Sequence, residues 1–252
     1  IRKHQLLRPF PHMAGLTDSA ASVGEARSDA LELSLERRFA KGFNLNIAYA
    51  RLRAREADIF LNEFDSTPGW RPTDAGPPHR FIASSIVELP FGAGKPFFSH
   101  GVLKHVLGGF QLGVTYEFQT GPPIDFPNLF YYGKLADIKK PRGTRTLDEW
   151  FNTANFERTS SKAPAAFHRR VFPTRVDDVR ADIMNEWNLN VQREFRFSES
   201  LRLQLRFDAI NALNRTVFGP PNSDPLSSNF GRITTQTEVP NRYVQLQGRL
   251  RF

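Results

Sequence analysis

Residues 110–119, FQLGVTYEFQ, alternate strictly between apolar and polar side chains. The apolar positions are Phe110, Leu112, Val114, Tyr116 and Phe118, and between them lie Gln111, Gly113, Thr115, Glu117 and Gln119. Successive side chains of a β-strand point to opposite faces, so this stretch predicts a strand with one apolar and one polar face.

Six other stretches show the same period of two. They are residues 30–39, 43–50, 80–91, 187–197, 201–208 and 244–252, and in 80–91 the alternation is blurred by Ile82 and Ile86. These stretches approach the roughly 9 to 11 residues that a tilted strand needs to cross a membrane, whereas strands of soluble proteins average about 5 to 6. The chain is therefore predicted to be all-β, with about seven antiparallel strands of a transmembrane β-barrel.

The composition is compatible with such a barrel and excludes other classes. Hydrophobic residues make up 40% of the 252 residues and charged residues 24%, but no apolar run is long enough for a membrane helix. In lipid, only helices and closed barrels satisfy every backbone hydrogen bond, which leaves the barrel. The chain has no cysteine, so disulfides and thiolate metal sites are excluded. The net charge is +8, but Lys and Arg are spread along the strands, which argues against a nucleic-acid partner.

The connections between the predicted strands are alternately short and long. Short ones fall at residues 40–42, 92–106 and 198–200, and long ones at about 54–78, 121–183 and 214–240. Outer-membrane barrels have short periplasmic turns and long external loops, so the C-terminus is expected on the periplasmic side. Residues 1–29 are interpreted as the end of another external loop, and residues 30–252 as the C-terminal part of the barrel. Because the smallest such barrels have eight strands, further strands are expected before residue 1.

The two faces of the strands predict two environments. The apolar parity is expected to face outer-membrane lipid and lipopolysaccharide, and the polar parity to line the barrel lumen. The charged residues expected in the lumen are Glu36, Arg38, Glu117, Glu194, Arg196, Arg202, Arg206, Asp208, Arg249 and Arg251. The aromatic residues expected as girdles at the membrane interfaces are Phe39, Phe43, Phe91, Phe110, Phe118, Trp187, Phe197 and Phe252. Arg37 and Arg193 fall on the lipid parity, where either snorkelling or a local bulge would accommodate them.

Several motifs, in their order and spacing, are shared with a known family. They are LSLERRFAKGF at residues 33–43, PHRF at 78–81, ELPFG at 88–92, GGFQL at 108–112, QTGPP at 119–123, WFNTANF at 150–156, FDAINALN at 207–214, NFGRI at 229–233 and the terminal Phe252. Over nearly its whole length the chain resembles the C-terminal barrel of TonB-dependent outer-membrane receptors, specifically the Oar-like group, which carries an N-terminal carboxypeptidase-regulatory-like domain.

The resemblance implies a transport function. Its members have a barrel of about 22 strands whose lumen is filled by an N-terminal plug. An external ligand binds loops and plug, and the TonB complex then pulls on the plug and opens a path. The last strand is also similar to the segment that the barrel-insertion machinery recognises, and the residues in question are Val244, Leu246, Gly248, Leu250 and Phe252. A lipid-facing strand would carry the same residues, so the two interpretations coincide.

Motifs for catalysis or cofactor binding are not found. GAGK at residues 92–95 lacks the first glycine of a phosphate-binding loop, and Pro96 stands where Ser or Thr is required. His100 and His105 have no accompanying carboxylates. The acidic residues at 177, 178 and 182 lack the spacing of a calcium loop and are interpreted as a solvated acidic stretch. We therefore expect no cofactor, no metal site and no enzyme activity.

Three alternatives to a transporter remain open. A structural or adhesive outer-membrane barrel would have the same strands without a plug or a TonB-binding segment. A soluble β-sandwich would bury the apolar parity in a core with aromatic ends. An enzyme is the third alternative and ranks last, because no nucleophile, base and orienting residue can be assembled from the sequence.

Overall fold

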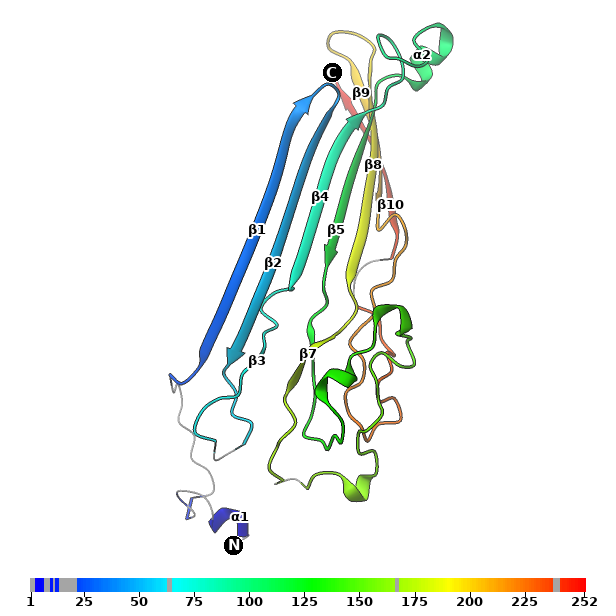
Figure 1. The fold of residues 1–252 in the computed structure, drawn as a ribbon. Coiled ribbons are helices and arrows are strands. Elements are labelled where there is room, and N and C mark those ends of the chain that lie inside the picture. Colours follow the sequence, from blue (N-terminus) through cyan, green and yellow to red (C-terminus); the bar gives the residue numbers. More distant parts are fainter. Residues whose placement is uncertain are drawn as a thin grey trace.

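The computed structural model describes residues 3–6, 10, 12–13, 22–62, 65–165, 168–237 and 241–252. Its main feature is a sheet in which each long strand pairs antiparallel with the next one along the chain (Figure 1). The long strands are β1 (Glu25–Ala40), β2 (Phe43–Ala57), β4 (His79–Glu88), β5 (Phe110–Gln119), β8 (Met184–Arg196), β9 (Arg202–Ile210) and β10 (Tyr243–Arg251). The two-residue β3 (Arg71–Pro72) adds to the end of β2. Each predicted stretch corresponds to one long strand, which confirms the all-β antiparallel prediction.

Some boundaries differ from the predicted ones. β1 begins at Glu25, so the last part of the predicted loop 1–29 belongs to the sheet, while residues 1–2, 7–9, 11 and 14–21 of that range lie outside the described residues. The β1–β2 ladder continues to the pair Glu25 and Ala57, beyond the apolar stretch. Arginines replace apolar residues there, so hydrophobic alternation no longer marks the strand. β4 ends at Glu88, and the stretch around Leu89 leaves the sheet.

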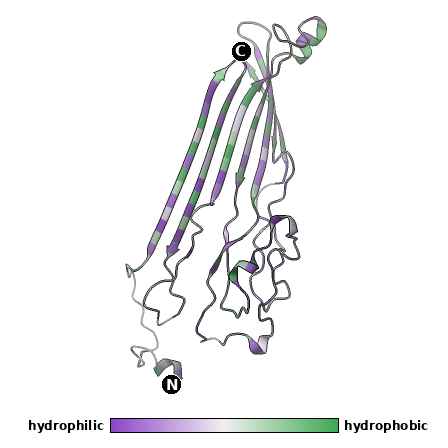
Figure 2. Cartoon of the chain, viewed as in Figure 1, coloured by the Kyte–Doolittle hydropathy of each residue, from purple (hydrophilic) through white to green (hydrophobic). Residues whose placement is uncertain are grey.

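Between β5 and β8 the register places apolar residues opposite apolar ones and polar residues opposite polar ones, whereas on β4 Ile82 lies opposite Glu117 and Ser85 opposite Val114. Val114 lies opposite Leu189 and Thr115 opposite Asn188, so apolar side chains share one face and polar side chains the other. The alternation of green and purple along the strands in Figure 2 shows the same pattern. The apolar face stays exposed, as Leu246 illustrates with 80% of its surface accessible. Among the described residues, the only buried apolar side chains contributed by the long strands are Ala57 and Ala209. This face is therefore not the core of a sandwich.

The connections differ at the two ends of the sheet. The β1–β2 turn, helix α2 (Gly101–Leu107), the β8–β9 turn and the C-terminus lie at one end, and the long segments lie at the other (Figure 1). Lys41 and Gly42 make the first turn with φ of 55° and 85°. The link predicted as a plain connection at 92–106 instead contains α2. Besides α2, the structure describes the short helix α1 (Lys3–Leu6), and no helix among the described residues is long and apolar enough to cross a membrane.

The two longest connections pack together into what we call the loop module, residues 120–183 and 211–237. It contains β6 (Pro123–Asp125), β7 (Arg175–Arg180) and the 3-10 helices η1 (Leu135–Ile138), η2 (Arg142–Thr144) and η3 (Ser160–Lys162). Its core holds Ile124, Phe126, Leu129, Ile138, Phe151, Phe156, Phe172, Val176, Val179 and Phe230. Five phenylalanines lie in this core. The aromatic residues of the chain are therefore not all at the strand ends, where the membrane girdles are predicted.

Candidate functional site

The polar face of the sheet is the candidate functional surface. The ladders align Glu36 with Asn46, Asp208 with Asn190, and Arg249 with Gln204, and so place the predicted lumen residues on one face. The residues so placed are Glu36, Glu117, Glu194, Arg196, Arg202, Arg206, Asp208, Arg249 and Arg251. The β1–β2 register shifts between Arg37 and Ala40, so alternation does not assign Arg38 to either face.

Ion pairs balance much of the charge on this face. Glu194 lies 3.0 Å from Arg196 and 3.9 Å from Arg202, so the structure brings three predicted residues together. Arg206 and Asp208 are 2.7 Å apart. Arg80, which the sequence analysis did not single out, pairs with Glu117 at 2.9 Å. Exposed pairs of this kind contribute about 1 kcal/mol or less each. They leave a polar wall on which acidic and basic side chains are interspersed.

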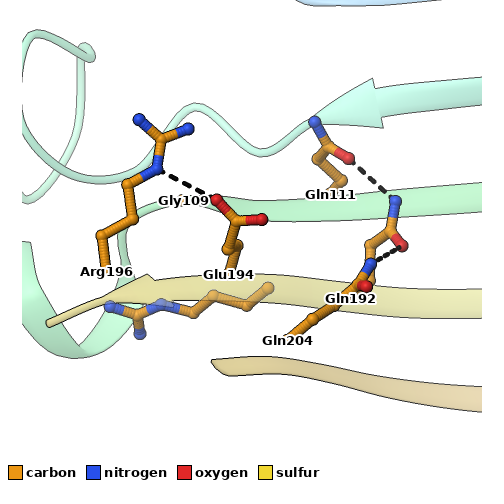
Figure 3. A pocket seen from close by; sticks show the side chains of 7 residues that line it. Gly109, Gln111, Gln192, Glu194, Arg196 and Gln204 are labelled. Atoms are coloured by element: carbon orange, nitrogen blue, oxygen red, sulfur yellow. Dashed lines mark hydrogen bonds and ion pairs between the residues drawn. The ribbon is translucent and has the colours of Figure 1, made fainter. Parts of the chain in front are cut away.

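Three glutamines form an amide ladder across this wall, in the recess of Figure 3. The side-chain amide of Gln192 donates through Nε2 to the side-chain oxygen Oε1 of Gln111 at 2.9 Å, and its own Oε1 accepts from Nε2 of Gln204 at 3.2 Å. The ladder therefore joins β5, β8 and β9 (Figure 3). Nearby, the Asn190 side chain crosses over Gly113, where an added Cβ would lie 2.2 Å from its amide nitrogen. Sequence reasoning missed both features, although the shared polar parity of these residues was visible.

The two arginines on the apolar parity stay on that face. The Arg37 guanidinium lies 3.9 Å from the centroid of the Phe43 ring, and the ladder has a register shift just after Arg37, between Arg37 and Ala40. Arg193 lies over Phe195 at 4.2 Å and donates hydrogen bonds to the backbone carbonyls of His105 and Val106. Its ladders with β5 and β9 run without a shift. Arg193 is therefore accommodated by the C-terminus of α2, and of the two alternatives considered for it, a local bulge is not found in these ladders.

The predicted assembly residues share the apolar face of β10. Val244, Leu246, Gly248 and Leu250 pair with Ala209, Phe207, Leu205 and Leu203 respectively. Phe252 follows the strand and is 96% exposed. The structure thus confirms the alternation on which the proposed assembly role depends.

A buried arginine joins the loop module to the end of the sheet. Arg175 on β7 is 5% exposed and contacts Glu56 of β2 at 3.1 Å, Asp74 at 2.9 Å and Asp125 at 2.6 Å. It also donates to the carbonyl oxygen of Pro72 at 3.0 Å. Burial lowers the pKa of Arg175, but its bonds to Asp125 and Asp74 outweigh burial and raise the pKa overall, so the charge persists. Removing one partner of such a buried group is strongly destabilising.

An arginine-lined recess lies beside this junction, between β2, residues 72–79 and β7. Its basic residues are Arg51, Arg53, Arg55, His79 and Arg180, and its acidic residues are Asp177 and Asp178. One guanidinium nitrogen of Arg55, Nη1, donates to both carboxylate oxygens of Asp177 at 3.0 Å, and Lys139 donates to Asp178 at 2.7 Å. Asp182 faces Arg215 at 3.3 Å. Each acidic residue considered for calcium thus has a basic partner, and Arg51 and Arg53 make no ion pair with a described residue.

The sequence comparison fits this architecture. Residues 1–245 match the family model described as an outer membrane beta barrel domain. The chain therefore belongs to this family and is located in the outer membrane, which excludes the soluble β-sandwich. No curated protein matches the sequence.

Proposed function

We propose that the chain is the C-terminal wall of a TonB-dependent outer-membrane receptor of the Oar-like group, which takes up a ligand with energy from the TonB complex. The barrel would have about 22 strands, and its lumen would hold an N-terminal plug of the same protein. The observation that carries the proposal is the polar face, where charged pairs and the glutamine ladder provide a wall suited to contact with a folded domain. We propose neither an enzyme activity nor a cofactor for it.

The open edges of the sheet support a barrel with further strands, and the length of β1 supports strands that project from the membrane. β1 and β10 form the two edges of the sheet, so its long strands do not close on each other. The 16 residues of β1 span about 53 Å at 3.3 Å per residue, far more than the apolar band of about 25 Å requires even for a tilted strand. β1 and its partner β2, with 15 residues, therefore extend beyond the membrane, and the loop module lies at that extended end, where an external ligand would first bind.

The remaining partners follow from the two faces. The apolar face would contact membrane lipid and lipopolysaccharide, and the terminal segment ending at Phe252 would be recognised by the barrel-insertion machinery. A ligand would contact the loop module and the plug, and the TonB complex would act on the plug from the opposite end. A structural or adhesive barrel would share the wall but would need neither plug nor TonB.

A crosslinking experiment on the full-length protein tests the plug. A photo-crosslinking residue at Arg206, on the polar face, should form intramolecular crosslinks to the region upstream of this chain, identified by mass spectrometry. The matched control is Leu205, its neighbour on the apolar face, which should form none. Crosslinking of neither position to upstream residues, together with a stable open conductance in planar bilayers, would identify an unplugged barrel and reject the proposal.

The orientation is tested by surface labelling of cells. In the full-length protein, a cysteine replacing Ser161 in the loop module should react with a membrane-impermeant reagent, whereas one replacing Ser198 in the β8–β9 turn should not. This outcome places in the periplasm the end of the sheet that carries the β8–β9 turn and the C-terminus, as transport requires. Equal labelling of both positions would reject the assigned orientation.

A further inference from the structure

The segment between β4 and β5, residues 89–109, is folded and is more than a turn; we call it the rim segment. Phe97 donates its backbone N–H to Pro90 at 3.1 Å, and Gly92 donates to Phe97 at 3.0 Å. The chain then forms α2 and returns past Gly92, where an added Cβ would lie 2.5 Å from the Cα of Gly108. Gly92 also has a φ of 104°. Gly92, the first glycine of the stretch that resembled a phosphate loop, therefore permits a close crossing of two backbones at Gly108.

Arg193 holds the end of this segment on the apolar side of the sheet. In the ladders Arg193 lies opposite Phe110 and Leu205, which belong to the apolar face. Its guanidinium donates to the carbonyls of His105 and Val106 in the last turn of α2. These carbonyls have no donor within a helix, and a cation near a helix C-terminus is favourable. The C-terminal end of α2 therefore lies on the face that the family membership assigns to lipid.

The rim segment exposes a group of large apolar side chains. The exposed fractions are 58% for Phe97, 46% for Phe98, 77% for Val102, 51% for Leu103 and 53% for Val106. The segment contains no acidic residue, and its ionisable side chains are Lys95, His100, Lys104 and His105. Lys95 is paired with Glu88 at the end of β4. An apolar surface with only basic residues is the composition of a segment that binds a membrane interface with anionic lipid.

We propose that the rim segment is an interfacial membrane anchor. α2 lies among the lipid headgroups of the leaflet at the end of the sheet that carries the C-terminus. Val102, Leu103 and Val106 contact the acyl chains, and Lys104 contacts the phosphates. The lipid is favoured over a protein partner because the segment continues the apolar face of the strands, through Phe110, and is on the opposite side from the polar face. The orientation proposed above makes this the periplasmic leaflet, but the anchor requires only that the barrel spans the membrane.

Spin labels on the full-length protein in phospholipid vesicles test the proposal. The chain itself has no cysteine, so single labels can be placed at Val106→Cys and, as a matched control, at Glu199→Cys in the β8–β9 turn at the same end. The label at 106 should be more accessible to oxygen, which concentrates in lipid, than to a water-soluble nickel complex. The label at 199 should show the reverse. Electrophoretic heat-modifiability confirms that each variant is folded.

Two outcomes would overturn the anchor. Nickel accessibility at 106 equal to that at 199 would place α2 in water. Shielding of position 106 from both reagents would show that protein, and not lipid, covers α2. In vesicles containing phosphatidylglycerol, Lys104→Gln should reduce the ratio of oxygen to nickel accessibility at 106, with a smaller change in vesicles of phosphatidylcholine alone. Equal reductions in both lipids would reject the phosphate contact of Lys104.

The role of Arg193 has its own test. Arg193→Gln should lower the ratio of oxygen to nickel accessibility at 106, because the helix loses the donor that holds its last carbonyls, while the barrel remains heat-modifiable. Arg37→Gln, at the other arginine on the apolar face, is the matched control, because Arg37 lies over Phe43, and it should leave the ratio unchanged. An unchanged ratio in Arg193→Gln would show that Arg193 does not position the anchor.

Discussion

The sheet and the loop module use their aromatic residues in opposite ways. Phe252 at the end of the sheet is 96% exposed, whereas Phe151 in the module is 1% exposed. In lipid an uncovered apolar side chain costs nothing, but in water the same side chain is stabilised by burial. The sheet can therefore leave its apolar face bare, while the module must enclose its own core. One chain is thus folded for two solvents.

The difference also separates the sources of stability. The sheet is held by backbone ladders between long strands, and the module by side-chain packing in which the Phe151 ring lies 5.4 Å from Phe230 and 5.5 Å from Phe126. Arg175 connects the two at the end of β2. We therefore expect core substitutions to loosen the module and charged substitutions on the apolar face to affect the sheet.

The largest effect is expected for Phe151→Ala. It leaves a cavity among packed rings and should cost the module about 3 to 5 kcal/mol. Limited proteolysis of the full-length protein in vesicles should then cut within residues 120–183 much faster, while the barrel stays heat-modifiable. Tyr132→Ala, at a 68% exposed position of the module, is the control. Loss of heat-modifiability in Phe151→Ala would show that the two regions are not stabilised separately.

The next effect separates the two faces of β5. Val114→Arg places a charge on the lipid face and should cost about 2 to 4 kcal/mol near the membrane midplane. Thr115→Arg, its neighbour on the polar face, should be tolerated far better. The yield of folded barrel in equilibrium refolding into vesicles measures both. Equal losses would mean that both faces are buried, which contradicts the contrast between sheet and module.

Deleting Phe252 tests the exposed aromatic end of the sheet. The equilibrium loss is limited to the apolar burial of one side chain, about 1.5 to 3 kcal/mol at most. If the terminal segment is recognised during insertion, the yield in the outer membrane of cells should fall much further than refolding of the purified chain. A cellular yield equal to that of the unaltered protein would reject recognition of this terminus.

The smallest effect concerns pH and the charged surface of the module. The hydrogen bond from Lys139 lowers the pKa of Asp178 below its usual value. A lowered pKa in the folded state stabilises it above the unfolded pKa of about 4, and this stability is lost as the pH falls through the folded value. Because the Asp178 side chain is 68% exposed, screening limits the effect to less than about 1 kcal/mol.

Proteolysis rates of the module at different pH values measure this effect. The rate should rise slightly as the pH is lowered below about 4, and Asp178→Asn should make the rate at neutral pH slightly higher and its pH dependence weaker. A pH dependence identical in the variant and the unaltered protein would show that the pair between Asp178 and Lys139 does not contribute.

The sequence by itself determined the strands, their faces and the ends at which the connections are long. Period-two alternation is a local property, and the ladders pair apolar with apolar positions as the parity required, for example Leu246 with Phe207. Alternation could not locate the outer part of β2, because arginines at 51, 53 and 55 occupy the parity that is apolar in residues 43–49.

Only the tertiary structure decided how the long connections fold and where their polar residues meet. Phe151 and Phe230 are far apart in the sequence and do not lie in stretches that alternate with period two, so no local pattern predicts that they share a core. Arg175 meets Glu56 and Arg193 meets α2 across similarly distant segments. Such contacts depend on how the strands bring their ends together in space, which alternation along one strand does not encode.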